Sequence, residues 1–166
     1  LVRRANLLRP KSGWVSKNLF DLQVKNHCWY DASITNQKLV KIGVINKSSN
    51  RERNSILSYQ MCRDALSKSN HVDAYKDFKR SYELDPTFIP GVLSFVRELI
   101  DRGQYSKDQN AVEKTWKFGP HPHLFELYWQ AVETQSPRDR TQASQSLLKI
   151  NPENYESQIT IVKPAI

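Results

Sequence analysis

Glycine and cysteine are scarce in this sequence, which has 5 glycines and 2 cysteines among 166 residues. So few glycines argue against a glycine-rich phosphate-binding loop. Cys28 and Cys62 form no CxxC pair, and two cysteines are too few for a disulfide framework. We therefore expect a protein of a reducing compartment.

Long hydrophobic runs are also missing. No segment approaches the roughly 18 uninterrupted apolar residues that a membrane-spanning helix needs, and residues 1–6 lack the apolar stretch of a signal peptide. The chain begins at Leu1 without an initiator Met, so we expect a piece of a longer protein. With 39% hydrophobic and 25% charged residues, the composition is typical of a folded chain.

Acidic residues are rare in the first third of the chain. Residues 1–53 contain 11 Lys or Arg and three acidic side chains, whereas the other 113 residues contain 14 of each sign. The whole net charge of +8 therefore lies in the first third. Such a region could attract anionic lipid, nucleic acid or an acidic partner, or it could be a solvated basic face.

Prolines follow helix-like segments at a repeated spacing. The distance from Pro86 to Pro120 is 34 residues and from Pro120 to Pro152 it is 32. Counting 34 residues from Pro10 reaches Val44, and the next gap is eight residues too long. We interpret the polar stretch 46–54 as an insertion. Proline ends a helix because it lacks an N–H group and disfavours a helical conformation in the residue before it.

Each period divides into two apolar segments with helical spacing, separated by turn signals. These signals are Asn26-His27, Ser69-Asn70-His71 and Arg102-Gly103-Gln104. The pattern predicts one helix–turn–helix unit per period. A single hairpin cannot bury both of its apolar faces, so neighbouring hairpins are expected to stack.

The period resembles the tetratricopeptide family, whose small residue in the second helix falls on Ala32 and Ala74. Asp108 occupies the third such position and departs from the pattern. The resemblance implies an all-α, tetratricopeptide-like stack of antiparallel helical hairpins, a right-handed α-solenoid. We expect this stack to form one domain over residues 1–166, with hairpins at about 13–44, 54–86, 88–120 and 122–152, a tail of an incomplete repeat at 1–10 and a terminal segment at 153–166.

Segments along nearly the whole chain, above all Glu113-Lys114-Thr115-Trp116 and Pro120-His121-Pro122-His123-Leu124, resemble the carboxy-terminal part of HemY-type proteins. This resemblance implies a bacterial inner-membrane protein with amino-terminal membrane helices, a cytoplasmic repeat domain and an association with late heme biosynthesis. The present chain has no such membrane helices, so we expect it to be soluble. It also has no dinucleotide fingerprint that would support oxidase chemistry.

Two histidine-containing segments are weak candidates for heme or metal binding. His121 and His123 flank a proline, and His27 precedes Cys28. Histidine and cysteine are both axial heme ligands, but both segments also suit turns between helices, with His121 at a helix entry. We expect no metal and no bound cofactor, with heme at His27 or His121 as the alternative.

No carboxylate has a base or nucleophile partner in the sequence, so we expect no enzyme activity. The aromatic residues recur at helical spacing, which favours core packing over a nucleic-acid stacking platform. We therefore expect no nucleic-acid partner.

The remaining candidates lie on the first helix of each hairpin, which lines the groove in the tetratricopeptide family. Arg63 and Arg97 occupy equivalent positions and could hold carboxylates of a partner peptide, or they could pair with local acids. The complete set of groove candidates is Lys17, Asp21, Tyr59, Arg63, Leu93 and Arg97. The sequence thus predicts a scaffold for protein or peptide partners, by resemblance heme-biosynthesis enzymes, with a porphyrin carrier as the alternative and an anionic membrane surface as a further partner.

Overall fold

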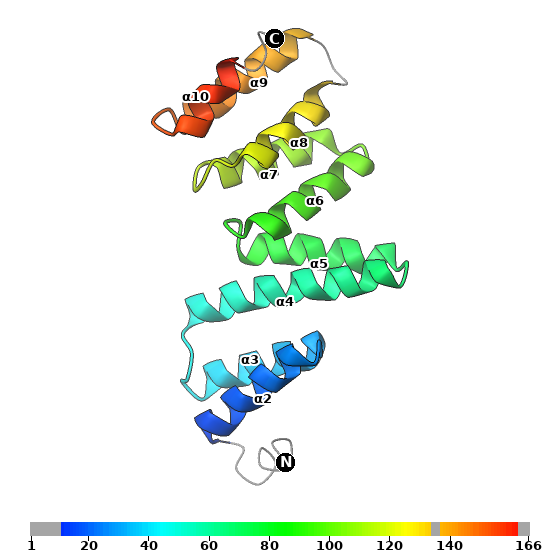
Figure 1. Cartoon of the computed structure of the whole chain (residues 1–166), viewed down its shortest axis with the longest axis vertical. Coiled ribbons are helices and arrows are strands. Elements are labelled where there is room, and N and C mark those ends of the chain that lie inside the picture. Colours follow the sequence, from blue (N-terminus) through cyan, green and yellow to red (C-terminus); the bar gives the residue numbers. More distant parts are fainter. Residues whose placement is uncertain (1–10, 134–136, 163–166) are drawn as a thin grey trace. The chain divides into compact units, whose positions relative to one another are not determined.

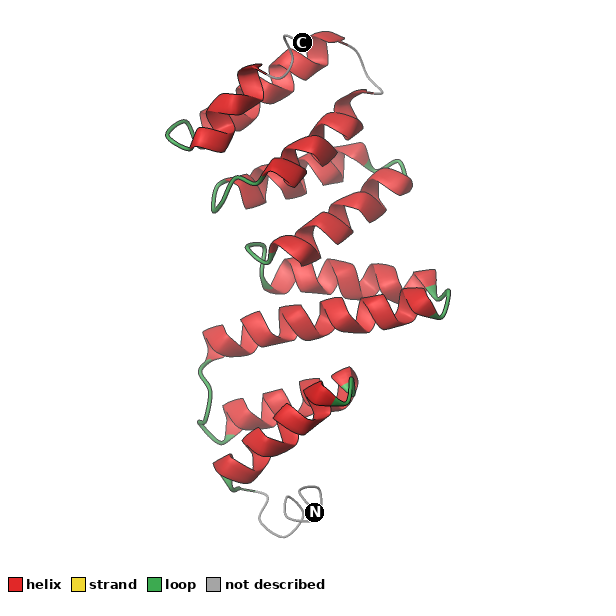
Figure 2. Cartoon of the chain, in the orientation of Figure 1, coloured by secondary structure: helices red, strands yellow, loops and turns green. Residues whose placement is uncertain are grey.

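The computed structural model of the chain describes residues 11–133 and 137–162, and within these ranges the secondary structure is helical without any strand (Figures 1 and 2). The prediction of an all-α fold is confirmed. The helices are α2 (Gly13–Lys25), α3 (Trp29–Lys41), α4 (Lys47–Ser67), α5 (His71–Leu84), α6 (Ile89–Asp101), α7 (Tyr105–Trp116), α8 (Pro122–Glu133), α9 (Pro137–Ile150) and α10 (Tyr155–Val162).

The chain forms two compact units. Unit 1 comprises Leu1–Phe88 and contains α2 to α5, and unit 2 comprises Ile89–Ile166 and contains α6 to α10. Within unit 1, α2 packs on α3, α3 on α4 and α4 on α5. Within unit 2, consecutive helices from α6 to α10 are likewise in contact. The predicted tail at residues 1–10 lies outside the described residues.

Short polar side chains define where several helices begin. The Ser12 hydroxyl accepts a hydrogen bond from the backbone N–H of Val15 at the start of α2. Asn46 accepts one from Ser49 N–H at 2.8 Å at the start of α4. Such caps satisfy backbone donors that have no partner inside the helix.

A residue with left-handed backbone conformation closes the first helix of three successive hairpins. These residues are His27, Ser69 and Gly103, with φ values of 56°, 57° and 67°. The next N–H along the chain bonds to the carbonyl five residues back in each case, at 2.8 to 2.9 Å: Cys28 to Gln23, Asn70 to Ala65, and Gln104 to Leu99. This is the Schellman arrangement of helix ends. The three turns lie where the sequence analysis divided each period.

The small-residue positions of the repeat are fully buried. Ala32, Ala74 and Asp108 each have an exposed fraction of 0%. In unit 1, the thiol of Cys62 in α4 lies 3.1 Å from the carbonyl oxygen of Ala74 in α5, so the two helices approach closely here. Asp108 is the only one of the three that brings an ionisable group to this kind of position.

The polar stretch that we interpreted as an insertion is helical. The first helix of the second hairpin begins at Lys47 instead of near residue 54, so the extra residues form the opening turns of α4. They are held from α3 by Asn36, whose Nδ2 donates to Asn50 Oδ1 at 2.9 Å and to Asn54 Oδ1 at 3.3 Å. The junction between the first two hairpins is therefore polar, which explains why no apolar helical pattern marked it in the sequence.

Unit 2 is built around Trp116, which is fully buried in α7. Its indole nitrogen donates a hydrogen bond to Ser157 Oγ of α10 at 2.8 Å. Tyr128 of α8 donates a hydrogen bond to Glu113 Oε1 of α7 at 2.8 Å. The segment after residue 152, for which the sequence predicted no particular structure, thus contributes a helix to this core.

Candidate partner-binding cleft

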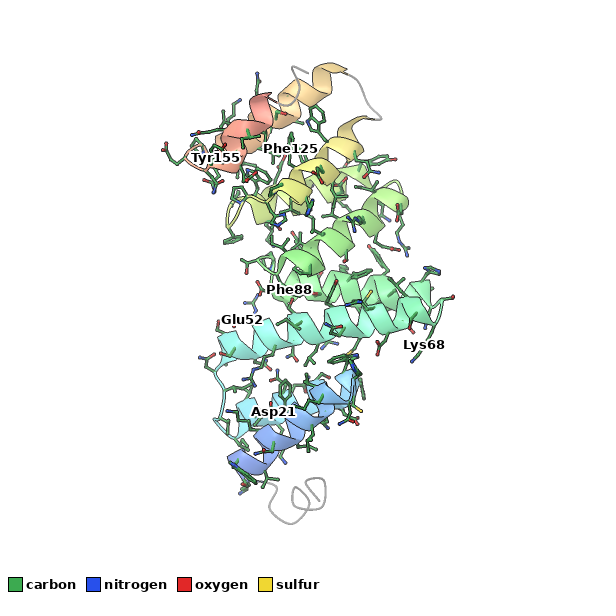
Figure 3. All side chains as sticks on the ribbon, in the orientation of Figure 1. Asp21, Glu52, Lys68, Phe88, Phe125 and Tyr155 are labelled. Carbon is green, nitrogen blue, oxygen red and sulfur yellow. The ribbon has the colours of Figure 1, made fainter. Side chains whose placement is uncertain are left out.

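A cleft of about 900 Å³ lies within unit 1. It is bordered by the turn between α2 and α3, the start of α3, the end of α4, and α5. Its lining residues are His27, Cys28, Trp29, Tyr30, Asp31, Met61, Asp64, Ala65, Lys68, Asn70, Asp73, Lys76, Asp77 and Arg80. Figure 3 labels Lys68 near the end of α4 that borders the cleft and Glu52 near the other end of this helix.

Apolar and aromatic side chains form part of the cleft wall. Tyr30 is 70% exposed, although it is a large aromatic residue. Met61 and Ala65 of α4 are half-buried. The His27 and Trp29 rings meet edge to face, with ring centroids 5.0 Å apart. Tyr30 therefore offers a large amphipathic surface that the fold leaves in solvent.

The acids of unit 1 are concentrated in the cleft. Residues 1–88 contain 16 Lys or Arg and 8 Asp or Glu, and the cleft lining contains four of those acids but three of those bases. A unit with a strongly positive charge thus has a lining with one more acid than base. The lining is therefore less repulsive to a cation than the rest of the unit is.

Asp73 has two contacts within the unit. Lys76 Nζ lies 3.4 Å from Asp73 Oδ1, and Asn70 Nδ2 donates to Asp73 Oδ2 at 2.7 Å. Both Lys76 and Asp73 are largely exposed, so this ion pair contributes little to stability. It does hold Asp73 at the start of α5, where a negative charge is favourable to the helix dipole.

Asp77 is less exposed to solvent than Asp73. It is half-buried, and burial raises the pKa of its carboxyl above the ordinary value. The Arg80 guanidinium lowers this pKa, while the neighbouring Asp73 raises it further. A cation placed beside Asp77 by a partner would stabilise its charged form, because an opposite charge offsets the cost of desolvation.

The groove residues predicted from the sequence do not line this cleft. Tyr59 packs within unit 1, with its ring 5.5 Å from that of Phe88 and 6.4 Å from that of Phe78. Tyr59 on α4 thus contacts one aromatic residue of α5 and one of the following turn, and its role in a groove stays a prediction. The other five candidates occupy α2, α4 and α6: Lys17, Asp21, Arg63 and Arg97 are exposed, and Leu93 is half-buried. Because Leu93 and Arg97 belong to unit 2, the groove stays a prediction.

The histidine candidates occupy turns and a helix entry. His27 is exposed at its left-handed turn. The Nδ1 atom of His121 accepts a hydrogen bond from the backbone N–H of His123 at 3.3 Å, and Pro122 opens α8. His123 Nδ1 lies 2.9 Å from Glu126 Oε2. Nowhere in residues 11–133 and 137–162 do three or more His, Cys, Asp or Glu side chains gather as a metal site. Heme binding at His27 or His121 stays a prediction.

Sequence reasoning assigned none of the lining residues to a partner cleft: it considered His27 and Cys28 as heme ligands and Asn70 as part of a turn. The cleft is assembled from helix ends that lie between 27 and 80 in the chain, and no motif connects them. The available signal was the rise in aspartate content after residue 63, since the first 53 residues have only three acids.

In the part of the chain that the structure describes, no helix combines the length and the hydrophobicity needed to cross a bilayer.

The helices, their turns and the cleft define a helical-hairpin repeat protein with a mixed polar and aromatic cleft. No known family model matches the sequence, and no curated protein is significantly similar to it. Among solved structures, the chain is similar to a thermophilic tetratricopeptide repeat protein of Thermus thermophilus, with 14% identity and a TM-score of 0.40. The match covers 99% of this chain and 87% of that one.

Proposed function

We propose that the protein is a non-enzymatic scaffold whose unit 1 binds a segment of a partner protein in the cleft. The observation that carries this proposal is the concentration of acids beside the exposed Tyr30 in an otherwise basic unit. The segment that fits this lining presents an arginine or lysine next to an apolar side chain.

Each part of such a segment has a counterpart in the cleft. The basic side chain would lie near the half-buried Asp64 and Asp77, where charge-assisted hydrogen bonds are shorter and stronger than neutral ones. The apolar side chain would pack against Tyr30 and Met61. Tyrosine and arginine are over-represented among the residues that dominate binding energy at protein interfaces.

Photo-crosslinking from the cleft tests this proposal. Benzoylphenylalanine placed at position 30 in the full chain should crosslink a discrete partner in cells. The same group at position 155 is a matched control, because Tyr30 and Tyr155 are exposed to similar extents, 70% and 72%, and Tyr155 lies in unit 2. Identical products from both positions would contradict binding in the cleft.

A second variant tests whether the partner contributes a basic residue to the cleft. Asp77→Lys should abolish the crosslink from position 30, because it places a cation where the partner's cation is expected. Persistence of the crosslink in this variant would show that the partner does not use a basic residue at this site.

The association with late heme biosynthesis has a separate basis, which is the resemblance of Glu113–Trp116 and Pro120–Leu124 to HemY-type proteins. Mass spectrometry of the partner crosslinked from position 30 would test it, because a heme-biosynthesis enzyme is the expected product. Direct porphyrin carriage is the alternative, and a heme titration tests it. A saturable Soret shift that disappears in His27→Ala or His121→Ala would favour the carrier over the scaffold.

A further inference from the structure

The end of unit 1 that lies away from the cleft is strongly basic. Lys11 precedes α2, Lys41 ends α3, and Lys47 and Arg51 belong to the first turns of α4. All four side chains are exposed. We call these four residues, together with Trp14 and Val44, the basic end.

Chain connectivity and one close contact bring these residues together. Only residues 42–46 separate α3 from α4, so Lys41 and Lys47 lie on either side of a short loop. The start of α2 meets the same loop, since a Cβ atom added to Gly13 would lie 2.7 Å from Val44 Cγ2. Figure 1 shows the first turn of α2 beside the connection between α3 and α4.

The basic end also exposes two apolar side chains. Trp14 in the first turn of α2 is 75% exposed, and Val44 in the loop is 41% exposed. Both lie among the lysines, because Trp14 follows Gly13 and Val44 contacts the same glycine position. An exposed tryptophan is costly in water but is favoured at a membrane–water interface, where its ring spans the apolar and polar layers.

Acids offset only part of this charge. The acid in the first turns of α4 is Glu52, which accepts a hydrogen bond from the neutral Ser48 hydroxyl at 3.1 Å and offsets one of the four basic charges. At the end of α5, Lys79 Nζ lies 3.6 Å from Glu83 Oε1. Asp85 Oδ1 accepts hydrogen bonds from the backbone N–H and the hydroxyl of Thr87. The basic end therefore keeps a net positive charge.

We propose that the basic end docks onto anionic lipid, with Lys11, Lys41, Lys47 and Arg51 facing the headgroups and Trp14 and Val44 entering the interface. A basic residue held near an anionic membrane strengthens binding about fivefold at ordinary surface potentials. Nucleic acid fits this surface less well. Single-stranded binding uses successive aromatic side chains as a stacking platform, whereas this end exposes one aromatic residue and one aliphatic residue.

Co-sedimentation of the full 166-residue chain with vesicles tests the proposal. Vesicles of phosphatidylcholine and phosphatidylserine at 7:3 should bind the protein, vesicles of phosphatidylcholine alone should bind it weakly, and added salt should weaken the anionic case. Equal binding to the two compositions would overturn the proposal. So would tighter binding to a 20-nucleotide single strand than to the anionic vesicles.

Two double variants with the same change in net charge test where the lipid-docking surface lies. Lys41→Glu with Lys47→Glu should weaken binding to the anionic vesicles tenfold or more. Lys25→Glu with Lys68→Glu changes the net charge equally, but these exposed residues lie at the cleft end of unit 1, so this variant should lose much less. Equal losses in the two variants would contradict a localised docking surface.

Tryptophan fluorescence gives an independent measure. Trp116 is fully buried and Trp29 and Trp129 are half-buried, so Trp14 is the indole most open to a change of surroundings. Anionic vesicles should shift the emission to shorter wavelength, and Trp14→Ala should remove this shift. A shift that persists in Trp14→Ala would show that this end of the unit does not enter the interface.

Discussion

Trp116 and Ser157 are 41 residues apart in the chain, and the indole nitrogen of the first donates a 2.8 Å hydrogen bond to the hydroxyl oxygen of the second. Both residues are fully buried. The bond joins α7 to α10 and satisfies a donor that has no access to water, so unit 2 depends on its last described helix.

Ser157→Ala should destabilise unit 2 by about 1–3 kcal/mol, because it leaves the buried indole N–H without an acceptor. Urea unfolding followed by circular dichroism measures the effect. Ser146→Ala is a control, since the Ser146 hydroxyl bonds to the Gln142 carbonyl of its own helix at 3.0 Å. Equal effects in the two variants would contradict a structural role for the bond to Ser157.

Asp108 should make unit 2 less stable as the pH rises. It is fully buried, neither of its carboxyl oxygens has a hydrogen-bond partner among the residues that the structure describes, and burial raises its pKa from 3.8 to about 7. Between these two pH values the folded state keeps a proton that the unfolded state has released. The free energy of unfolding therefore falls with rising pH across this window, by up to about 4 kcal/mol.

Asp108→Asn should remove most of this pH dependence. The variant should be more stable than the wild type at pH 8 and similar to it at pH 4, as measured by urea unfolding at both pH values. Asp101→Asn, which alters an exposed acid of the same unit, is the control. A wild-type stability that rises between pH 4 and pH 7, with no gain at pH 8 from Asp108→Asn, would contradict this account.

The three left-handed turns should respond differently to glycine. His27→Gly and Ser69→Gly should each stabilise unit 1 by up to about 1 kcal/mol, because a side chain is strained at positive φ and glycine is not. Gly103→Ala should destabilise unit 2 by a similar amount. Thermal unfolding measures these changes.

Lys68 provides the control for these substitutions. It precedes Ser69 but has a φ of −101°, so Lys68→Gly relieves no such strain. If Lys68→Gly stabilised the unit as much as Ser69→Gly, the effect would not come from the left-handed conformation.

The sequence predicted the helical hairpins because their signals are local and periodic. Ala32 and Ala74 mark close helix contacts, and the turns at Ser69 and Gly103 repeat at the 34-residue period. The opening turns of α4 escaped this reasoning because their buried contacts are made by asparagines, Asn36, Asn50 and Asn54. A search for apolar residues at helical spacing cannot distinguish a helix with polar buried contacts from a loop.

The cleft could not be predicted in the same way. Tyr30, Asp64 and Asp77 come from three helices, and their proximity depends on how α3 packs on α4 and α4 on α5. A register search projects positions along equivalent helices, so it does not find a site that is assembled from parts of different helices.

A peptide titration followed by NMR tests the central claim most directly. The labelled full chain would be titrated with Ac-Leu-Arg-Leu-Arg-Leu-NH2 and, separately, with the same peptide carrying Glu in place of Arg. The arginine peptide should shift the amides of cleft residues, including Cys28, Ala65 and Asp77, and Asp77→Lys should suppress these shifts. The glutamate peptide should leave the cleft amides unchanged. Shifts from the arginine peptide that miss the cleft, or equal cleft shifts from both peptides, would contradict the proposal that unit 1 binds a basic segment of a partner in this cleft.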